Sequence, residues 1–428
     1  MSDCNCPLKE ASLDAPNHLA YLSPSHSLTF SQLDQLSDSY VSHLSHLPPQ
    51  SRIAVLHPPN HQLIALFFAA FRLNLSICIL SHRIPPSQIP TYLSRLQPSL
   101  FLTSLDPPFP SLYPDHPVYP VPSLFLFTSG STGTPKIAVL SLSNLLSAAE
   151  PALAALDLRA NDQWLLSLPL FHVGGIGILI RCILARATIV LDETSPNITH
   201  LSYVPTQLYR SWPIYRHLRC LMLGGASINH CPPQLPIYAT YGLTEMSSLI
   251  LSRFKPTTPY LGHPLKGREV RLAPDNEILV RGECLFQGYW ENGQLHLPVD
   301  NEGWFATGDL GHFSPQEGFA ITGRKDWQFI SGGENIQPEE IERELLSLPE
   351  VLEAVVIPIP DAEFGHRPAA AVRLSDSSFD LKRMQRALSD KLPKYKIPIV
   401  LIPVDTFPKS GLKIDRKRIF QTVNQNFI

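Results

Sequence analysis

Short apolar runs alternate with longer stretches of helical periodicity through most of the chain. Arg52–Leu56 and Ile77–Leu80 read as buried strands, and between them Asn60 can cap an apolar helix that runs to about Asn74. This strand–helix–strand order predicts a parallel sheet covered by helices. The same pattern predicts strands at Leu124–Phe127, Trp164–Leu168, Cys220–Leu223 and Ile237–Glu245, and helices at Leu33–Leu44, Asn144–Leu156 and from Tyr203.

The pattern changes after Gly262 and again near Gly323. Leu279–Gly282 and Gly303–Gly311 predict short strands with tight turns, which suggests a small β-barrel. Beyond the charged segment Gly323–Trp327 follows a small α+β unit, with helices from Gln337 and over Leu381–Leu392, and strands at Val355–Ile357 and, as the last one, Ile399–Ile402. The predicted fold class is α/β, with a large N-terminal domain of parallel sheets, helices and the small barrel (1–323) and a small α+β C-terminal domain (324–428).

Composition excludes some classes of function. The chain has 428 residues, 44% hydrophobic and 17% charged, with a net charge of −3. These values are typical of a globular protein and argue against a nucleic-acid partner or an anionic membrane surface. The 42 prolines are about twice the average share. Residues 84–123 are especially rich in proline, and there we expect a surface connection rather than an SH3-type ligand at Pro107–Pro110.

Cysteine usage and hydropathy predict a cytoplasmic protein. Seven dispersed cysteines suggest reduced thiols. The first residues lack the apolar run of a signal peptide, so none is expected. Leu63–Leu80 and Leu170–Leu191 are apolar but interrupted by polar and charged residues, so neither predicts a membrane span. The sequence leaves the oligomeric state open.

A loop rich in glycine and hydroxyl groups follows the strand at Leu124–Phe127. Its lysine, Lys136, stands three positions after the second glycine, so the loop is not a Walker A motif. Glycines allow close backbone approach, while hydroxyl, amide and ammonium groups attract an anion. The alternative is a flexible turn. The residues that this prediction assigns to an anion are Thr128, Ser129, Gly130, Ser131, Thr132, Gly133 and Lys136.

Three more predicted strands end in small, polar or reactive residues. His172 precedes Gly174 and Gly175, which open a helix; this indicates either a bound ligand or a core histidine beside a helix start that tolerates glycine. Gly224–Ser227 and Tyr241–Glu245 follow two further strands. In an open α/β sheet, ligands bind at the carboxyl ends of the strands. The four ends together favour a binding site.

These motifs, in this order, resemble the adenylate-forming superfamily of acyl-CoA synthetases, peptide-synthetase adenylation domains and luciferases. They are the loop 128–136, Tyr241–Glu245, Gly303–Asp309, Gly323–Asp326 and a late lysine, Lys413. The resemblance spans almost the whole chain. It implies a mobile C-terminal domain and two half-reactions. A carboxylate attacks the α-phosphorus of ATP to give an acyl-adenylate and pyrophosphate, and the thiol of coenzyme A then attacks the acyl group.

The resemblance also implies roles for single residues. The loop would hold the leaving pyrophosphate, and Thr244 and Glu245 would bind the α-phosphate and Mg²⁺, respectively, as their chemistry allows. Asp309 and Arg324 would bind the ribose, although an ordinary ion pair would explain them as well. The other predicted ATP-binding residues are Tyr241, which would stack on adenine, Gly242, Gly225 and Ala226.

The C-terminal domain would act through two surfaces. Lys413 would reach the α-phosphate and the carboxylate during adenylation, although Leu412 stands where the superfamily has a glycine and Gly411 lies one position earlier. Asp326 would be the hinge about which the domain turns. After the turn, Gly332 and Gly333 would line the channel for coenzyme A.

The acid is suggested by resemblance to o-succinylbenzoate–CoA ligases of menaquinone biosynthesis, over Leu168–Arg181, Ser202–Tyr209 and Gly365–Pro368. That substrate is a dianion, so its second carboxylate needs a fixed cation. Arg181 is the candidate; a solvent-facing or acid-paired Arg181 is the alternative. His172 would flank the reacting carboxylate or gate the pocket, with Gly174 and Gly175 beside it. Two other functions stay open: a synthetase for another aromatic or medium-chain acid, and an inactive binding or scaffolding relative.

Overall fold

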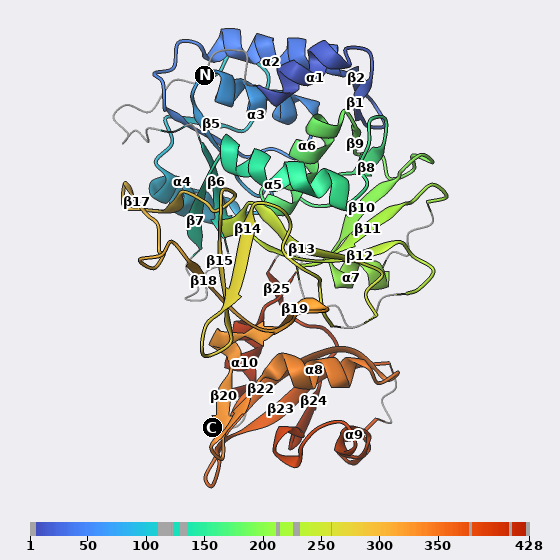
Figure 1. The fold of residues 1–428 in the computed structure, drawn as a ribbon. Helices are drawn as coiled ribbons and strands as arrows, with labels where there is room; N and C mark the ends of the chain where they lie inside the picture. The colour runs from blue at the N-terminus through green and yellow to red at the C-terminus, as the bar shows by residue number, and fades with distance from the viewer. Residues whose placement is uncertain are drawn as a thin grey trace.

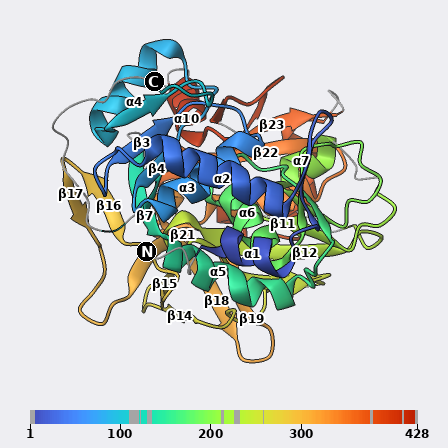
Figure 2. The ribbon, with the colours of Figure 1, turned by 90° about the horizontal axis from the view of Figure 1, so that it is seen from above.

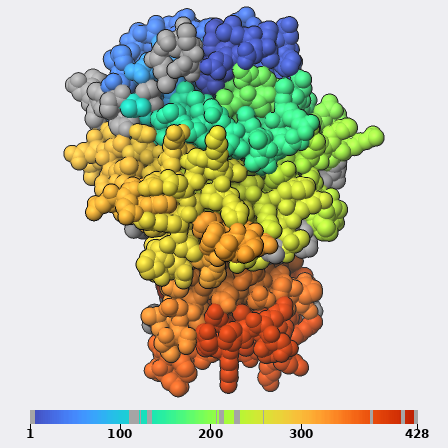
Figure 3. Space-filling model, in the orientation of Figure 1, coloured from blue at the N-terminus to red at the C-terminus, as the bar shows by residue number. Residues whose placement is uncertain are grey.

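Two mixed sheets with parallel centres form most of the large upper body in Figure 1. The computed structural model describes residues 6–109, 121, 123–128, 135–210, 215–225, 232–257, 259–375, 379–410 and 413–424. The chain runs from this body, which holds the N-terminal part, to a smaller lower body that holds the C-terminal part (Figures 1 and 3). The α/β class predicted from the strand–helix rhythm is confirmed.

The first sheet has seven strands in the order β17-β16-β7-β6-β4-β3-β5. Its neighbours from β6 to β5 are parallel, as predicted, and the β6–β7, β7–β16 and β16–β17 pairs are antiparallel. The strands are β3 (Arg52–Val55), β4 (Ser76–Ile79), β5 (Leu100–Leu102), β6 (Ser123–Thr128), β7 (Lys136–Ser141), β16 (Gly288–Glu291) and β17 (Gln294–His296).

The second sheet has eight strands in the order β13-β12-β11-β10-β8-β9-β1-β2. The six inner strands are parallel, and each edge strand is antiparallel to its neighbour. The strands are β1 (Leu19–Leu22), β2 (Ser27–Thr29), β8 (Gln163–Leu165), β9 (Thr188–Val190), β10 (His200–Tyr203), β11 (Cys220–Leu223), β12 (Ile237–Leu243) and β13 (Ser248–Phe254).

Helices cover these sheets, as Figure 2 shows from above. Asn60 accepts a hydrogen bond from the Leu63 amide, the cap that the sequence predicts for α3. Thr29 and Ser141 begin α2 and α5 with capping boxes. Among the described residues, none of the helices combines the length and the apolar character that crossing a membrane would need. The helices are α1 (Pro7–Asp14), α2 (Phe30–Leu44), α3 (His61–Arg72), α4 (Ile89–Leu96), α5 (Leu142–Ala155), α6 (Val173–Ala185) and α7 (Pro205–Arg210).

The proline-rich stretch is more ordered than we predicted. Within 84–109 the chain forms α4 and β5, and β5 pairs with β3 at the edge of the first sheet. Pro90 lies in the first turn of α4, where a helix has no amide hydrogen bond to lose. Because proline fits the first turn of a helix, the high proline content of this stretch did not exclude α4, which we did not predict from the sequence.

Antiparallel strands follow, but they form an open sheet rather than the expected barrel. The order is β14-β15-β18-β19. The strands β16 and β17, which lie between them in the sequence, extend the first sheet instead. The strands of the 262–324 segment therefore belong to two different sheets. The strands are β14 (Arg268–Leu272), β15 (Glu277–Gly282), β18 (Phe305–Ser314) and β19 (Gly318–Arg324).

The lower body is an α+β unit with hydrophobic clusters of its own. The predicted helices are present as α8 and α9. Two further short strands and α10 follow the strand that we expected to be the last. The boundary at 323/324 stays a prediction and coincides with the end of β19. The elements are β20 (Phe329–Ser331), β21 (Glu334–Ile336), α8 (Pro338–Leu346), β22 (Val351–Asp361), β23 (Gly365–Leu374), α9 (Leu381–Ser389), β24 (Val400–Pro403), β25 (Lys409–Ser410), β26 (Lys413–Ile414) and α10 (Arg416–Asn424).

A buried polar cluster joins the first three helices. The carboxylate of Asp34 in α2 pairs with Arg72 of α3 and with Lys9 of α1, whose Nζ lies 2.9 Å away. Arg72 also pairs with Asp38, but half of that side chain is exposed (51%) whereas Asp34 is 6% exposed. Removing one partner of a buried ion pair leaves an uncompensated charge, which costs far more than losing an exposed pair.

We therefore expect Asp34→Ala to lower the free energy of unfolding by about 3 kcal/mol. Asp38→Ala, which removes a neighbouring acid from the same arginine, should change it by about 1 kcal/mol at most. Urea unfolding monitored by circular dichroism measures both. Equal losses would show that Asp34 does not hold the three helices together.

Candidate active site

Tyr241, Asp309 and Arg324 form one hydrogen-bonded group. The hydroxyl of Tyr241, near the end of β12, donates to Asp309 Oδ2 at 2.7 Å. Arg324 Nη1 donates to Asp309 Oδ1 at 3.0 Å and to the Thr307 carbonyl at 2.9 Å, since β18 and β19 place Asp309 opposite Arg324. Burial and the Asp309 carboxylate raise the pKa of Tyr241 well above its usual value. The tyrosine is therefore a stable donor beside a carboxylate that can accept further hydroxyl groups.

Glu245 is four residues after Tyr241 in the sequence. It belongs to a 3₁₀ turn (Thr244–Met246) that directly follows β12. Its Oε1 accepts a hydrogen bond of 2.6 Å from the hydroxyl of Tyr289 in β16, and its backbone carbonyl accepts one of 2.8 Å from the Phe286 amide. The ammonium of Lys136 lies 4.6 Å from the centre of the Tyr289 ring. Predicted residues from two sheets thus meet around one tyrosine.

Sequence reasoning missed Tyr289. Its neighbours Gly288 and Trp290 are unremarkable strand residues, and its partner Glu245 is 44 positions away, in the turn that follows a strand of the other sheet. The feature that points to Tyr289 is that its strand, β16, pairs with β7, which begins with Lys136. This pairing is visible in the structure and not in the local sequence pattern. Burial and the Glu245 carboxylate together raise the pKa of Tyr289.

At some of the predicted glycines, the local backbone structure itself leaves no room for a side chain or favours glycine. A β-carbon on Gly242 would lie 1.9 Å from the Ser248 carbonyl, where the β12–β13 register shifts. A β-carbon on Gly175 would lie 2.2 Å from the Pro169 carbonyl. The close approach at these two positions is to the chain itself, whereas Gly225 uses a positive φ of 76°. Their roles toward a ligand stay predictions.

Several predicted residues lie outside the described part of the chain. These are Ser129, Gly130, Ser131, Thr132 and Gly133 of the loop, and Ala226, Gly411 and Leu412. The ends of the loop are described: Thr128 in β6 pairs with Lys136 in β7. For Lys413, the structure describes the backbone, which pairs with Ser410 in the β25–β26 hairpin.

His172 is at the exposed N-terminal end of α6. Its ring lies 4.6 Å from that of Phe171, which in turn lies 6.1 Å from the ring of His82 after β4. This excludes the core histidine that we considered as an alternative. Gly174 packs on Leu168, whose Cδ1 would lie 2.9 Å from an added β-carbon. The start of α6 is thus close to the ends of β8 and β4.

Arg181, on the same helix, is 2% exposed, which excludes a solvent-facing side chain. Its Nη2 donates to Ser248 Oγ at 3.0 Å, and its guanidinium lies 5.7 Å from the Trp164 ring. Among the described residues no carboxylate pairs with it, and its Nε has no hydrogen-bond acceptor. Burial and nearby Arg268 lower the pKa of Arg181 to about 10. Such a cation is costly unless an anion compensates it.

The predicted hinge and channel residues follow β19 in the sequence. Asp326 follows β19 and forms an exposed ion pair with Arg324, with 3.1 Å between Oδ2 and Nη2. Gly332 and Gly333 join β20 to β21 at positive φ values of 58° and 87°. Both are exposed, and no atom outside the chain neighbours lies within 4 Å of a β-carbon added to Gly333. The turn therefore presents open backbone at Gly333, whereas Gly332 packs against Phe364, whose Cδ1 would lie 2.6 Å from an added β-carbon.

The described residues fit a magnesium ion shared with phosphates better than a metal cage. None of their His, Cys, Asp and Glu side chains form a group of three or more that could hold a metal. Glu245 offers one carboxylate, of which Oε1 is bonded to Tyr289. Mg²⁺ is commonly held by one or two carboxylates together with substrate phosphates.

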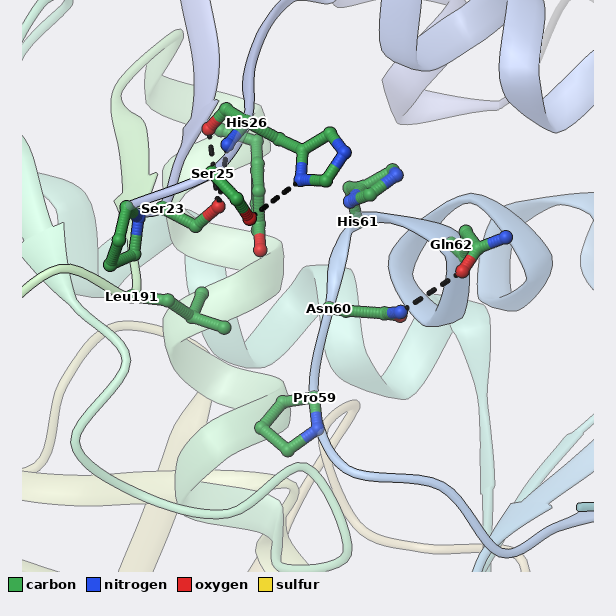
Figure 4. A pocket seen from close by; sticks show the side chains of 10 residues that line it. Ser23, Ser25, His26, Pro59, Asn60, His61, Gln62 and Leu191 are labelled. Atoms are coloured by element: carbon green, nitrogen blue, oxygen red, sulfur yellow. Dashed lines mark hydrogen bonds between the residues drawn. The ribbon is translucent and has the colours of Figure 1, made fainter. Parts of the chain in front are cut away.

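A hollow of about 510 Å³ lies elsewhere on the large body. Figure 4 shows it between the β1–β2 loop, with Ser25 bonded to His26, and the start of α3 at Asn60 and His61. None of the predicted site residues line it. Its lining consists of Tyr21, Ser23, Pro24, Ser25, His26, Pro59, Asn60, His61, Gln62 and Leu191.

Comparisons with known proteins agree with this geometry. A family model described as AMP-binding enzyme matches residues 8–122 and 116–290, and one for the AMP-binding enzyme C-terminal domain matches 340–412. A 2-succinylbenzoate–CoA ligase of Salmonella typhimurium is 39% identical over 317 residues, 70% of this chain and 68% of the relative. One of Bacillus licheniformis is 28% identical over 464 residues, 94% of this chain and 96% of the relative.

Solved structures agree as well. An arginine-to-lysine variant of Escherichia coli MenE with bound OSB-AMS is 29% identical, with a TM-score of 0.82 and full coverage of both chains. The Bacillus subtilis o-succinylbenzoate CoA synthetase (MenE) in complex with the acyl-adenylate intermediate OSB-AMP has a TM-score of 0.84 over 97% of each chain; at 23% identity it supports the fold. Because the AMP-binding model covers more than half of the chain, the chain belongs to the AMP-binding enzyme family.

Proposed function

We propose that this chain is a 2-succinylbenzoate–CoA ligase. The observation that carries the proposal is its 39% identity to the ligase of Salmonella typhimurium over 70% of the chain. The substrate would be o-succinylbenzoate (2-succinylbenzoate). The reaction would first give o-succinylbenzoyl-adenylate and pyrophosphate, and then o-succinylbenzoyl-CoA and AMP, a step of menaquinone biosynthesis.

For ATP, the chain offers donors and acceptors near the end of β12, in the middle of β18 and at the end of β19. Asp309 would accept the two ribose hydroxyls while Arg324 fixes its carboxylate, and Tyr241 would stack on adenine. The end of the loop at Lys136 would bring charge to the leaving pyrophosphate. Preorganised cations and donors stabilise the charge that develops at phosphorus, which is the main requirement of this displacement.

Thr244 and Glu245 would act at the α-phosphate. Thr244 would donate a hydrogen bond there, and the free oxygen of Glu245 would hold Mg²⁺, which neutralises charge on the phosphates. Lys413 would add a second cation from the small domain. A turn about Asp326 would then exchange Lys413 for Gly332 and Gly333, and the open backbone at Gly333 suits a narrow channel for the thiol arm of coenzyme A.

For the acid, Arg181 would compensate the second carboxylate. Its guanidinium is buried, has no acidic partner among the described residues and lies beside Gly177, where an added β-carbon would be 3.1 Å from Nη2. The guanidinium thus packs directly on Gly177, whose lack of a side chain makes room for it. His172 and the glycines Gly174 and Gly175 would border the reacting carboxylate at the start of the same helix.

A cytoplasmic location is part of the proposal. The five described cysteines are free and buried, which suits a reducing compartment.

Release of pyrophosphate across a panel of acids tests the function. We expect release with o-succinylbenzoate, and formation of the CoA thioester when coenzyme A is added. A monocarboxylic aryl acid or a medium-chain fatty acid should react at least about tenfold less well, because the cation would be left unpaired. Release only with such acids would favour the alternative synthetase, and no release with any acid would favour the inactive relative.

Separate assays of the two half-reactions test the role of Lys413. Lys413→Ala should slow adenylation by about 10²–10³-fold, the effect of losing one transition-state contact. Thioester formation from supplied acyl-adenylate should be largely spared. The control is Lys409→Ala, a lysine of the neighbouring strand that instead pairs with Glu353 at 3.2 Å. Equal losses in both half-reactions would contradict the assigned role.

Arg181→Met should raise KM for o-succinylbenzoate by about 10–100-fold through loss of a charge-assisted hydrogen bond. KM for ATP should hardly change. The unfolding temperature should not fall, since methionine fills similar volume without a buried charge. An analogue without the ring carboxylate should react at least as well with the variant as with the wild type, because the variant leaves no cation unpaired. An unchanged KM for the dianion would remove Arg181 from the acid site.

A further inference from the structure

Tyr289 contacts both residues that the proposed function places on the phosphates and their metal. Its hydroxyl donates to Glu245 Oε1 at 2.6 Å, and its ring centre lies 4.6 Å from Lys136 Nζ. Glu245 follows a strand of the second sheet, whereas Lys136 begins β7 in the first. One side chain therefore connects a carboxylate and a cation that come from two different sheets.

Strand pairing fixes the position of the ring. Tyr289 lies opposite Ala138 in the antiparallel β16–β7 pair. Lys136 is two residues before Ala138 and so lies on the same face of the sheet, within reach of an aromatic diagonal neighbour. Phe286 packs against the ring with 4.8 Å between centroids, and its amide bonds to the Glu245 carbonyl. Backbone pairing thus holds the tyrosine and the turn that carries Glu245 in one arrangement.

The hydroxyl has a function that packing alone would not require. A phenylalanine would pack on Phe286 equally well, but it could not donate to the carboxylate. The bond to Oε1 restricts the rotation of Glu245 and leaves Oε2 for another ligand.

We propose that Tyr289 is a positioning residue for the metal and the pyrophosphate: its hydroxyl orients Glu245 toward Mg²⁺, and its ring orients Lys136 toward the phosphates. This inference rests on the proposed function and deepens it. Groups that orient a metal ligand typically change metal affinity by about 10–100-fold when they are removed.

Calorimetric titration with ATP in the absence of any acid tests the proposal without turnover. Each protein is titrated once with Mg²⁺ and once with EDTA, and the ratio of the two dissociation constants is the gain from magnesium. We expect Tyr289→Phe to reduce this gain by about tenfold or more and to leave the affinity in EDTA nearly unchanged. Tyr289→Leu, which also removes the ring, should in addition weaken binding in EDTA by about threefold.

Tyr40→Phe is the matched control. It removes a buried tyrosine hydroxyl that donates to the Leu105 carbonyl at 2.8 Å, outside the candidate site. A merely structural role for Tyr289 would lower the unfolding temperature, as this control should, without changing the gain from magnesium. In a Glu245→Gln background, Tyr289→Phe should reduce the gain no further, because the residue that it positions has already lost its charge.

A gain from magnesium that is equal in wild type and Tyr289→Phe would overturn the role of the hydroxyl. Equal affinities of the Phe and Leu variants in EDTA would overturn the role of the ring. Both outcomes differ from failure of the proposed function, which is measured on the wild type alone as absence of pyrophosphate release with o-succinylbenzoate.

Discussion

The end of β12 connects all three sheets of the large body through two side-chain hydrogen bonds. Tyr241 donates to Asp309 in the antiparallel sheet, and four residues later Glu245 accepts from Tyr289 in the first sheet. Each bond pairs a tyrosine hydroxyl with a carboxylate, and in each case burial favours the protonated tyrosine. The register of three sheets therefore determines the spacing between a carboxylate suited to a sugar and one suited to a metal. A shift of one strand would change that spacing and with it the site.

Buried arginines illustrate how a structural cation differs from a candidate binding group. Arg268 donates to the carbonyls of Leu249, Lys266 and Ala148, so its cost of burial is offset within the chain. Arg52 has two nitrogens without acceptors but stacks on Trp290, with 4.5 Å to the ring centre. Unpaired nitrogens alone therefore do not identify a site. What distinguishes Arg181 is its place on the helix that His172 begins, where Gly177 makes room for the guanidinium.

The parts that could be predicted from the sequence are those set by local chemistry. Asn60 caps α3 as expected, and continuous apolar runs indicated β3, β4, β6 and β11, because these strands are buried on both faces. Local patterns could not show that β16 leaves its neighbours in sequence and joins β7. That pairing depends on contacts between residues about 150 positions apart. The open antiparallel sheet and the role of Tyr289 follow from this single long-range pairing, so both were missed together.

The contacts of residues 324–326 bear on where a hinge between the two domains would lie. Arg324 is tied to Asp309, and Lys325 is tied to Asp275 and Glu277 at 2.6 and 2.8 Å, so the chain is attached to the antiparallel sheet up to residue 325. Asp326 is the next residue, and its ion pair with Arg324 is exposed. An exposed pair is worth little and is screened by salt. A rotation that begins at Asp326 would therefore break this weak pair together with the hydrogen bonds of the Arg324 backbone to Gln337 and Glu339, and would keep the Asp309–Arg324 pair intact. A rotation that begins one residue earlier would in addition break both pairs of Lys325.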